Sequence, residues 1–196
     1  QKADENIINI AKKEVENLEK KMLEIAKQMH EIREKTAVEL NEKITEELSD
    51  LEMKNARFKA DIDYNENEFN SNGLDKIEFL ISTNVGDVYK PLIKIASGGE
   101  MSRIMLGIKK VLADVDKVPV LVFDEIDTGI SGIAANKVAE KLKAISVTHQ
   151  VLCITHQASI AAKGAHNYYI SKEIKDNQTR TKIKKLNQEE KVKEIA

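Results

Sequence analysis

Neither glycine, proline nor an aromatic side chain occurs before Phe58, and this absence constrains the fold more than any other feature. Apolar side chains recur there in alternating steps of three and four, with Lys and Glu between them, which is the a/d seam of a coiled coil. The seam consists of Ile8, Ala11, Val15, Leu18, Met22, Ile25, Met29 and Ile32. The spacing predicts one long helix that pairs with a second helix. The alternative is a long amphipathic helix that packs on its own domain.

The apolar series continues beyond this seam, but out of phase with it. It resumes at Ala37, Leu40, Ile44, Leu48 and Leu51. Such a phase change indicates either a stutter or a helix that turns onto a globular body. We therefore expect a returning coiled-coil arm over residues 1–52 and a globular lobe over residues 53–196.

The period changes to two in the predicted lobe, where apolar and charged residues alternate from Ala56 to Tyr64. This alternation predicts a half-buried strand, which a loop over residues 65–75 joins to a second strand. Segments with apolar residues at helical spacing then alternate with short, wholly apolar segments. The remaining predicted elements are a strand over 76–83, helices over 100–115 and 133–145, strands over 118–123 and 150–155, and closing strands over 167–171 and 180–186. This order predicts an α/β fold with a parallel sheet and an antiparallel edge.

The composition excludes several classes of protein. The chain has 31 Lys and Arg against 33 Asp and Glu, a formal net charge of −2, which excludes a stand-alone basic DNA-coating protein. Residues 1–54 carry 10 basic and 14 acidic residues, whereas residues 172–196 carry eight basic and five acidic, a run that usually forms a solvated face. The single Cys153 cannot form an internal disulfide, so we expect a cytoplasmic, reducing compartment. No apolar run approaches the roughly 20 residues of a membrane span, so we expect no membrane partner.

Ser97-Gly98-Gly99-Glu100 directly precedes a predicted helix. Two glycines allow the backbone to approach a ligand closely, and the start of a helix offers free N–H groups to an anion such as phosphate. The same letters also form a capping box, in which Ser97 caps the helix and Glu100 occupies its third position. By itself the motif favours the capping role.

An apolar strand over 120–123 ends in two carboxylates, Asp124 and Glu125. A carboxylate at the carboxyl end of a buried parallel strand can hold Mg²⁺, and its neighbour can accept a proton from an attacking water. The alternative is an ordinary polar turn. A flexible turn over 129–132 follows, and His156 emerges from the next predicted strand, where it can contact a terminal phosphate or serve as a structural residue.

The order of these motifs resembles the signature motif, Walker B motif and switch histidine of ATP-binding-cassette (ABC) ATPases. The preceding coiled coil narrows the resemblance to the SMC-like group. The segments 53–58, 79–84, 95–106, 124–132 and 153–156 are similar to the carboxyl-terminal half of the RecN family of bacterial DNA repair proteins. The implied fold is the carboxyl-terminal lobe of an ABC-type P-loop ATPase head with an amino-terminal coiled-coil helix.

The resemblance implies a role for each matching residue. Asp124 belongs to the Mg²⁺ site, Glu125 polarises the hydrolytic water and His156 contacts the γ-phosphate of ATP. The signature residues bind a nucleotide held mainly by a second protomer; these residues are Ser97, Gly98, Gly99 and Glu100. The implied partners are the amino-terminal half of the same protein, a second ATP-engaged head and nucleoid DNA, and the implied activity is ATP hydrolysis in double-strand break repair and recombination.

No G-x-x-x-x-G-K-[ST] sequence occurs anywhere in the chain, so the main cradle for the β- and γ-phosphates is missing. The SMC-like resemblance places that loop in the amino-terminal half, which predicts that these 196 residues alone neither bind ATP tightly nor hydrolyse it. Two alternatives belong to other classes. One is a nucleotide-independent coiled-coil interaction module. The other is the nucleotide-binding subunit of a transporter, against which the coiled-coil arm argues.

Overall fold

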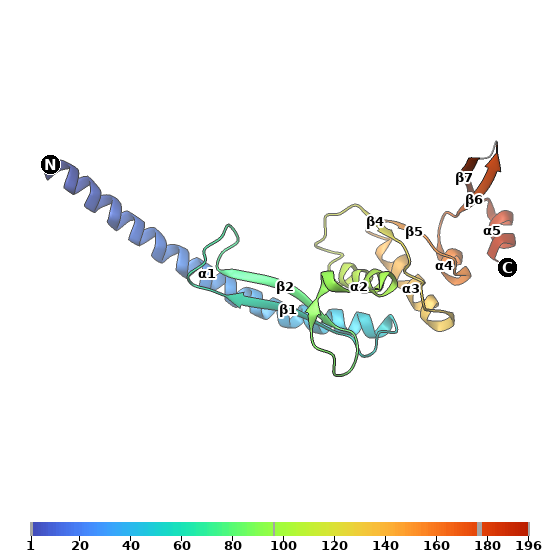
Figure 1. Ribbon diagram of the computed structural model, residues 1–196, viewed down its shortest axis with the longest axis horizontal. Coiled ribbons are helices and arrows are strands. Elements are labelled where there is room, and N and C mark those ends of the chain that lie inside the picture. The colour runs from blue at the N-terminus through green and yellow to red at the C-terminus, as the bar shows by residue number, and fades with distance from the viewer. Residues whose placement is uncertain (1, 96, 176–177, 196) are drawn as a thin grey trace. The chain divides into compact units, whose positions relative to one another are not determined.

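The computed structural model describes residues 2–95, 97–175 and 178–195 (Figure 1). Its elements are α1 (Lys2–Asp50), β1 (Arg57–Tyr64), β2 (Asp75–Ser82), β3 (Lys90–Pro91), the 3-10 helix η1 (Leu92–Lys94), α2 (Gly98–Val111), β4 (Val120–Phe123), α3 (Gly132–Ile145), β5 (Gln150–Cys153), α4 (Ala158–Lys163), β6 (Tyr168–Lys175), β7 (Gln178–Lys185) and α5 (Gln188–Ile195). The chain forms two compact units. The first unit contains residues 1–45 and 56–93, and the second contains residues 46–55 and 94–196.

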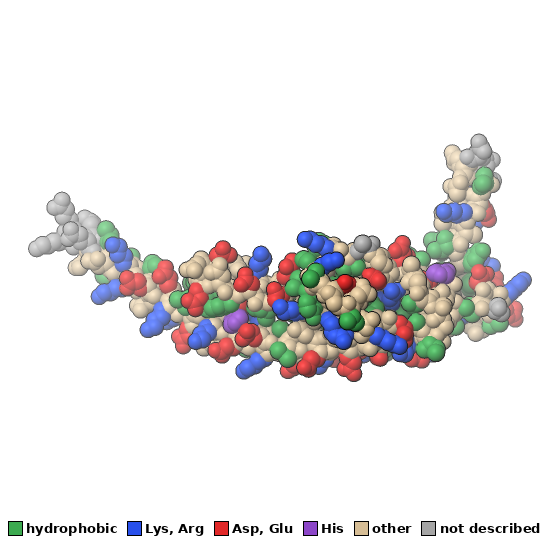
Figure 2. All heavy atoms as spheres, turned by 60° about the horizontal axis from the view of Figure 1, so that its bottom comes forward, with side chains coloured by type: hydrophobic (Ala, Val, Ile, Leu, Met, Phe, Trp, Pro, Cys, Tyr) green, Lys and Arg blue, Asp and Glu red, His purple; other side chains and the backbone are tan. Residues whose placement is uncertain are grey.

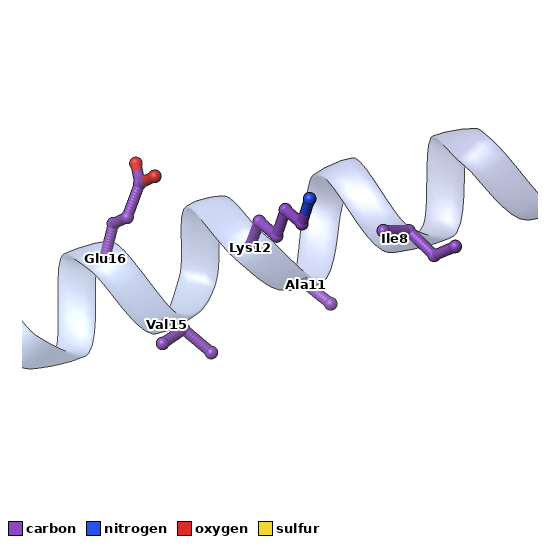
Figure 3. Close-up of a pocket in the computed structure, with 5 residues that line it drawn as sticks. All are labelled: Ile8, Ala11, Lys12, Val15 and Glu16. Carbon is purple, nitrogen blue, oxygen red and sulfur yellow. The ribbon is translucent and has the colours of Figure 1, made fainter.

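Helix α1 is continuous over 49 residues, which confirms the prediction of one long helix. Six of its apolar seam side chains are between 47% and 65% exposed: Ile8, Val15, Leu18, Met22, Ile25 and Ile32. Figure 3 shows the start of this seam, with Ala11 and Val15 on one side of the helix and Lys12 and Glu16 on the other. The out-of-phase series differs from the seam because four of its side chains are buried: Ala37, Ile44, Leu48 and Leu51. The out-of-phase series thus lies on the packed side of the helix, a side that is buried from Ala26 onward, whereas the seam lies on another side.

In the first unit, β1 and β2 form the predicted antiparallel pair and lie alongside α1 (Figure 1). Asn41 and Thr45 of the helix accept hydrogen bonds from the backbone N–H groups of Ala60 and Phe58, at 2.7 Å and 3.2 Å. Phe58 and Ala60 alternate with exposed residues and face the helix side, as the period of two predicts. Side-chain acceptors on α1 therefore fix the register of the outer strand against the helix.

A buried carboxylate also holds the β2 end of this pair to α1. The Asp75 side chain is fully buried and receives Arg33 Nη1 at 2.6 Å and His30 Nδ1 at 2.7 Å. Arg33 Nη2 donates to the carbonyl of Asn72 at 2.8 Å, and the His30 ring lies 4.5 Å from that of Tyr64. Burial of a charge costs free energy unless it is paired, and both oxygens of Asp75 have partners here.

In the second unit, β4 and β5 pair in parallel, with Phe123 opposite Cys153. Helices α2, α3 and α4, strand β4 and the residue that follows α1 contribute to a core of Leu51, Leu106, Leu121, Phe123, Ile126, Val138, Ala139, Leu142, Ile145 and Ile160. Gly107 of α2 leaves room for Leu48, because a Cβ there would lie 3.4 Å from Leu48 Cδ2. Lys141 of α3 forms ion pairs with Glu47 and Asp50, which hold the end of α1 to this unit.

The sheet differs from the one mixed sheet that the sequence predicts. Among the described residues there are three separate sheets, of strand order β1-β2-β3, β4-β5 and β6-β7. The closing strands pair only with each other, as an antiparallel hairpin longer than predicted. Helices α4 and α5 are only six and eight residues long, too short for a helical period to be recognised in the sequence.

Candidate functional site

The carboxyl end of β4 carries the two carboxylates that the sequence singled out. Asp124 Oδ1 accepts a hydrogen bond from the Glu125 N–H at 2.9 Å, and the Asp124 carbonyl accepts one from Ser102 Oγ at 2.6 Å. Both acidic side chains are exposed. Glu125 adopts φ +57°, a left-handed conformation that costs a non-glycine residue about 1 kcal/mol or more. Backbone strain of this kind is typical of functional positions.

Helix α2 begins directly beside these carboxylates. Ser97 is its N-cap in an extended conformation, and Ser97 Oγ accepts from the Glu100 N–H at 3.4 Å. That distance is at the long end for a hydrogen bond, so the cap is weak. The capping role of Ser97 is present, but it does not account for the two glycines that follow.

Those glycines allow α2 to approach the β4 end closely. A Cβ on Gly98 would overlap the Glu125 carboxylate. A Cβ on Gly99 would lie 3.0 Å from Thr128 Cβ and 3.1 Å from the carbonyl oxygens of Glu125 and Thr128. Because backbone atoms line the Gly99 side, only glycine fits there without moving the loop after β4.

Arg103, one turn into α2, binds the backbone of the loop that follows β4. Its side chain is buried, and Nη1 donates to the carbonyl of Thr128 at 2.9 Å and lies 3.5 Å from that of Ile126. The buried Nε has no hydrogen-bond partner among the described residues. Burial lowers the pKa of Arg103, an effect that the charge of Glu100 partly opposes. The guanidinium thus ties the signature helix to the segment that follows the carboxylates.

The end of β5 lies beside the end of β4, as Ile154 N–H donates to the Phe123 carbonyl at 2.9 Å. His156 is 72% exposed, and its Nδ1 lies 3.2 Å from Oδ2 of the buried Asp127. The same Oδ2 accepts hydrogen bonds from Thr155 Oγ1 and, at 2.9 Å, from the His156 N–H. Burial would raise the pKa of Asp127, but these hydrogen bonds and the His156 charge outweigh burial and lower it.

The side chains at this site can supply only part of the coordination of a Mg²⁺ ion. Among the described residues, no group of three or more His, Cys, Asp and Glu side chains could hold a metal ion. Asp124 offers one exposed carboxylate at the end of a strand. Mg²⁺ keeps several waters and is usually bound through one or two carboxylates together with substrate phosphates, so this arrangement suits a metal that arrives with a nucleotide.

The structure thus brings the predicted residues of three motifs to one end of the β4–β5 pair. Asp124 and Glu125 lie at the start of α2, and His156 follows the adjacent strand. Sequence reasoning did not single out Asp127 or Arg103. A third acidic residue, four positions after the end of β4, was the available signal for Asp127, whereas a lone Arg on a helical face gives none.

Comparisons with known proteins show the family and the fold of the chain. No family model matches the chain. The chain is 39% identical over 198 residues to the DNA repair protein RecN of Bacillus subtilis, which covers 94% of this chain and 34% of that protein. It is 36% identical over 194 residues to RecN of Vibrio cholerae, and the alignment covers 99% of this chain and 35% of that protein. The chain therefore spans about a third of the length of the curated relatives that it matches.

A solved structure supports the fold. The Smc head domain with a coiled coil and joint from Pyrococcus yayanosii superposes with a TM-score of 0.61 at 21% identity, over 88% of this chain and 31% of that one. None of the helices in the described parts of this chain is long and apolar enough to span a bilayer. On sequence and fold together, the chain belongs to the RecN family of DNA repair proteins and has the α/β fold of an SMC-like ABC ATPase head.

Proposed function

We propose that this chain is the carboxyl-terminal lobe of an ATPase head that acts in DNA double-strand break repair and recombination. One observation carries the proposal. The start of α2, the two carboxylates after β4 and the histidine after β5 lie at the same end of one parallel strand pair. Open α/β sheets bind their ligands at the carboxyl ends of parallel strands.

Each motif then has a role toward ATP. Asp124 would hold Mg²⁺, which offsets the negative charge on the phosphates when it is bound. Glu125 orients the attacking water and accepts its proton, and His156 contacts the γ-phosphate. The N–H groups at the start of α2 bind a nucleotide of a second head, with Ser97 supplying its hydroxyl and Glu100 the helix cap.

Two apolar surfaces support a partner that supplies the missing parts of the head. Parallel sheets are normally covered on both faces, yet Val122, Leu152 and Ile154 of the β4–β5 region are 62%, 49% and 51% exposed. The seam of α1 is equally uncovered. We propose that the amino-terminal part of the same protein covers both surfaces and supplies the P-loop. In this scheme residues 1–52 are the returning arm and residues 53–196 the lobe.

DNA and a second head complete the proposed set of partners. The DNA assignment comes from the RecN relatives, and it implies action in the cytoplasm on nucleoid DNA. On the face shown in Figure 2, basic and acidic side chains are interspersed along the chain. Two of the lysines on β7 are also neutralised, since Lys182 pairs with Glu173 and Lys184 with Glu190. DNA binding is therefore expected of the assembled, nucleotide-engaged dimer.

The test is to co-express this chain with the P-loop part of the protein and to measure ATP turnover with and without DNA. We expect turnover in the complex, and neither turnover nor micromolar ATP affinity in the chain alone. Glu125→Gln should abolish turnover in the complex while ATP still binds. Glu140→Gln, an exposed carboxamide exchange on α3, is the matched control and should leave turnover unchanged.

The exposed seam of α1 also favours a second candidate, a nucleotide-independent interaction module. In that case the complex would form through α1 but would not hydrolyse ATP, and Glu125→Gln would behave like the parent chain. Turnover that is lost in Glu125→Gln excludes this candidate.

A further inference from the structure

Asp127 is a buried carboxylate that serves the His156 segment. Its side chain is 2% exposed. Oδ2 alone receives the Thr155 hydroxyl and the His156 backbone N–H, and it also lies 3.2 Å from the His156 ring. One carboxylate oxygen thus holds the backbone at His156 and lies within ion-pair distance of its ring.

A negative charge on Asp127 acts differently on the two neutral tautomers of His156. An unprotonated Nδ1 places its lone pair near a carboxylate oxygen 3.2 Å away, which is repulsive. A protonated Nδ1 is attracted to the same oxygen. The lowered pKa of Asp127 keeps the carboxylate ionised at neutral pH, so the repulsion applies throughout the working range.

The loop that carries Asp127 is itself held on two sides. Gln157 N–H donates to Thr155 Oγ1 at 3.0 Å, and Gln157 Nε2 donates to the Ile130 carbonyl at 3.1 Å. On the opposite side, Arg103 donates to the Thr128 carbonyl. The carboxylate therefore has a fixed position from which to orient a ring that is otherwise exposed.

We propose that Asp127 is a positioning residue that holds the neutral His156 ring in the tautomer with its proton on Nδ1, so that Nε2 is the atom presented to a ligand. This inference rests on the proposed function for the identity of that ligand, the γ-phosphate of ATP. When Nε2 takes up a proton, the ring donates to a phosphate oxygen and the Asp127 carboxylate offsets the positive charge. The ring orientation is the same in both states.

The first readout is the tautomer itself, measured by imidazole ¹H–¹⁵N correlation NMR on the complex of this chain with the P-loop part. His156→Gln identifies the signal among those of the four histidines of this chain, and the spectra are recorded at about pH 8.5, two units above the pKa of an ordinary imidazole. We expect the Nδ1–H tautomer in the parent protein and a shift toward Nε2–H in Asp127→Asn, which removes the charge but keeps an acceptor. Thr155→Val, which removes the hydroxyl that binds Asp127 and Gln157 but leaves the charge on Asp127, should retain Nδ1–H.

Asp116→Asn is the matched control, because Asp116 is a second anchored carboxylate of the same unit, held by Lys109 and the Val118 N–H. It should leave the His156 tautomer unchanged. In ATP turnover, Asp127→Asn should lower kcat about tenfold with KM little changed, whereas Asp116→Asn should not.

Two results would overturn the inference: an Nε2–H tautomer in the parent protein, or the same tautomer in the parent and Asp127→Asn. A complex with no ATP turnover but with the expected tautomer shift would overturn the proposed function and leave the positioning role supported. The two claims therefore fail separately.

Discussion

Gly98, at the start of α2, lies so close to Glu125, at the end of β4, that a Cβ on Gly98 would overlap the Glu125 carboxylate. The first turn of a helix carries partial positive charge, which attracts a carboxylate. The left-handed backbone of Glu125 places the end of β4 against this turn. The two motifs that the sequence separates by 27 positions therefore form one contact within a single chain.

The two signature glycines should respond differently to alanine. Gly98→Ala displaces only the exposed end of the Glu125 side chain and gains from reduced freedom of the unfolded chain, so the free energy of unfolding should change by less than about 1 kcal/mol. Gly99→Ala meets the backbone carbonyls of Glu125 and Thr128 and should cost about 1 to 3 kcal/mol. Urea unfolding of both variants measures the difference.

ATP turnover should be sensitive to Gly98→Ala even though the stability of that variant changes little. In the complex with the P-loop part, Gly98→Ala should reduce ATP turnover without loss of folded protein, because the Glu125 carboxylate is displaced. Equal stability losses in the two variants would contradict the arrangement of Gly98 and Gly99 described above.

Ser97→Ala separates the capping role of this residue from the signature role. The cap is a single hydrogen bond of 3.4 Å, so its loss should cost about 0.5 kcal/mol, the low end for N-caps. If Ser97 also binds a phosphate, ATP-dependent association of two heads should weaken by much more than this. Thermal unfolding measures the loss of stability, and sedimentation with ATP measures the association of the heads. A large loss of stability with unchanged association would assign Ser97 to capping alone.

The arm was the part of the fold that sequence predicts best. Its period is sustained over many residues, and no helix breaker interrupts it. The phase change after Ile32 also carried information, since the seam residues are exposed and Ile44 and Leu48 are fully buried. The pairing of the closing strands was not predictable, because alternation identifies a strand but not its neighbour.

The candidate site, like the fold, was predictable from the sequence only in part. Motif order was sufficient to select Asp124, Glu125 and His156, because strand ends are visible in the sequence. The roles of Asp127 and Arg103 depend on contacts between elements more than 20 residues apart, Asp127 with His156 and Arg103 with Thr128. Such contacts leave no local pattern.

Cys153 should be unreactive in the folded chain. Burial, with smaller contributions from the charges of Asp127 and Asp124, raises the pKa of its thiol to about 11. At pH 8 the reactive thiolate fraction is then lower than that of a free cysteine by about two orders of magnitude. Iodoacetamide labelling followed by mass spectrometry should show slow modification that becomes fast in urea. Rapid labelling of the folded chain would mean that β5 is accessible.

Asp75→Ala should destabilise the first unit selectively. The substitution leaves Arg33 and His30 facing a buried space without their acceptor, while these two side chains remain 24% and 19% exposed. Partial exposure reduces the penalty below that of a fully buried pair, so we expect a loss of about 2 to 3 kcal/mol. Asp61→Ala is the matched control on β1. Its salt bridge with Lys59 joins two side chains that are both more than 40% exposed, so its loss should cost much less than the loss of Asp75.

Hydrogen exchange can assign this loss to one unit, since amides report local opening. In Asp75→Ala, the amides of β1 and β2 should exchange faster, while those of β4 and β5 in the second unit keep their protection. A uniform loss of protection would mean that the two units unfold together. Unchanged protection in β1 and β2 would mean that Asn41 and Thr45, which bind the backbone of β1, hold the strand pair without Asp75. The double variant Asp75→Leu with Arg33→Met distinguishes a charge effect from packing, because it removes the charge pair while keeping apolar volume, and it should recover most of the lost stability.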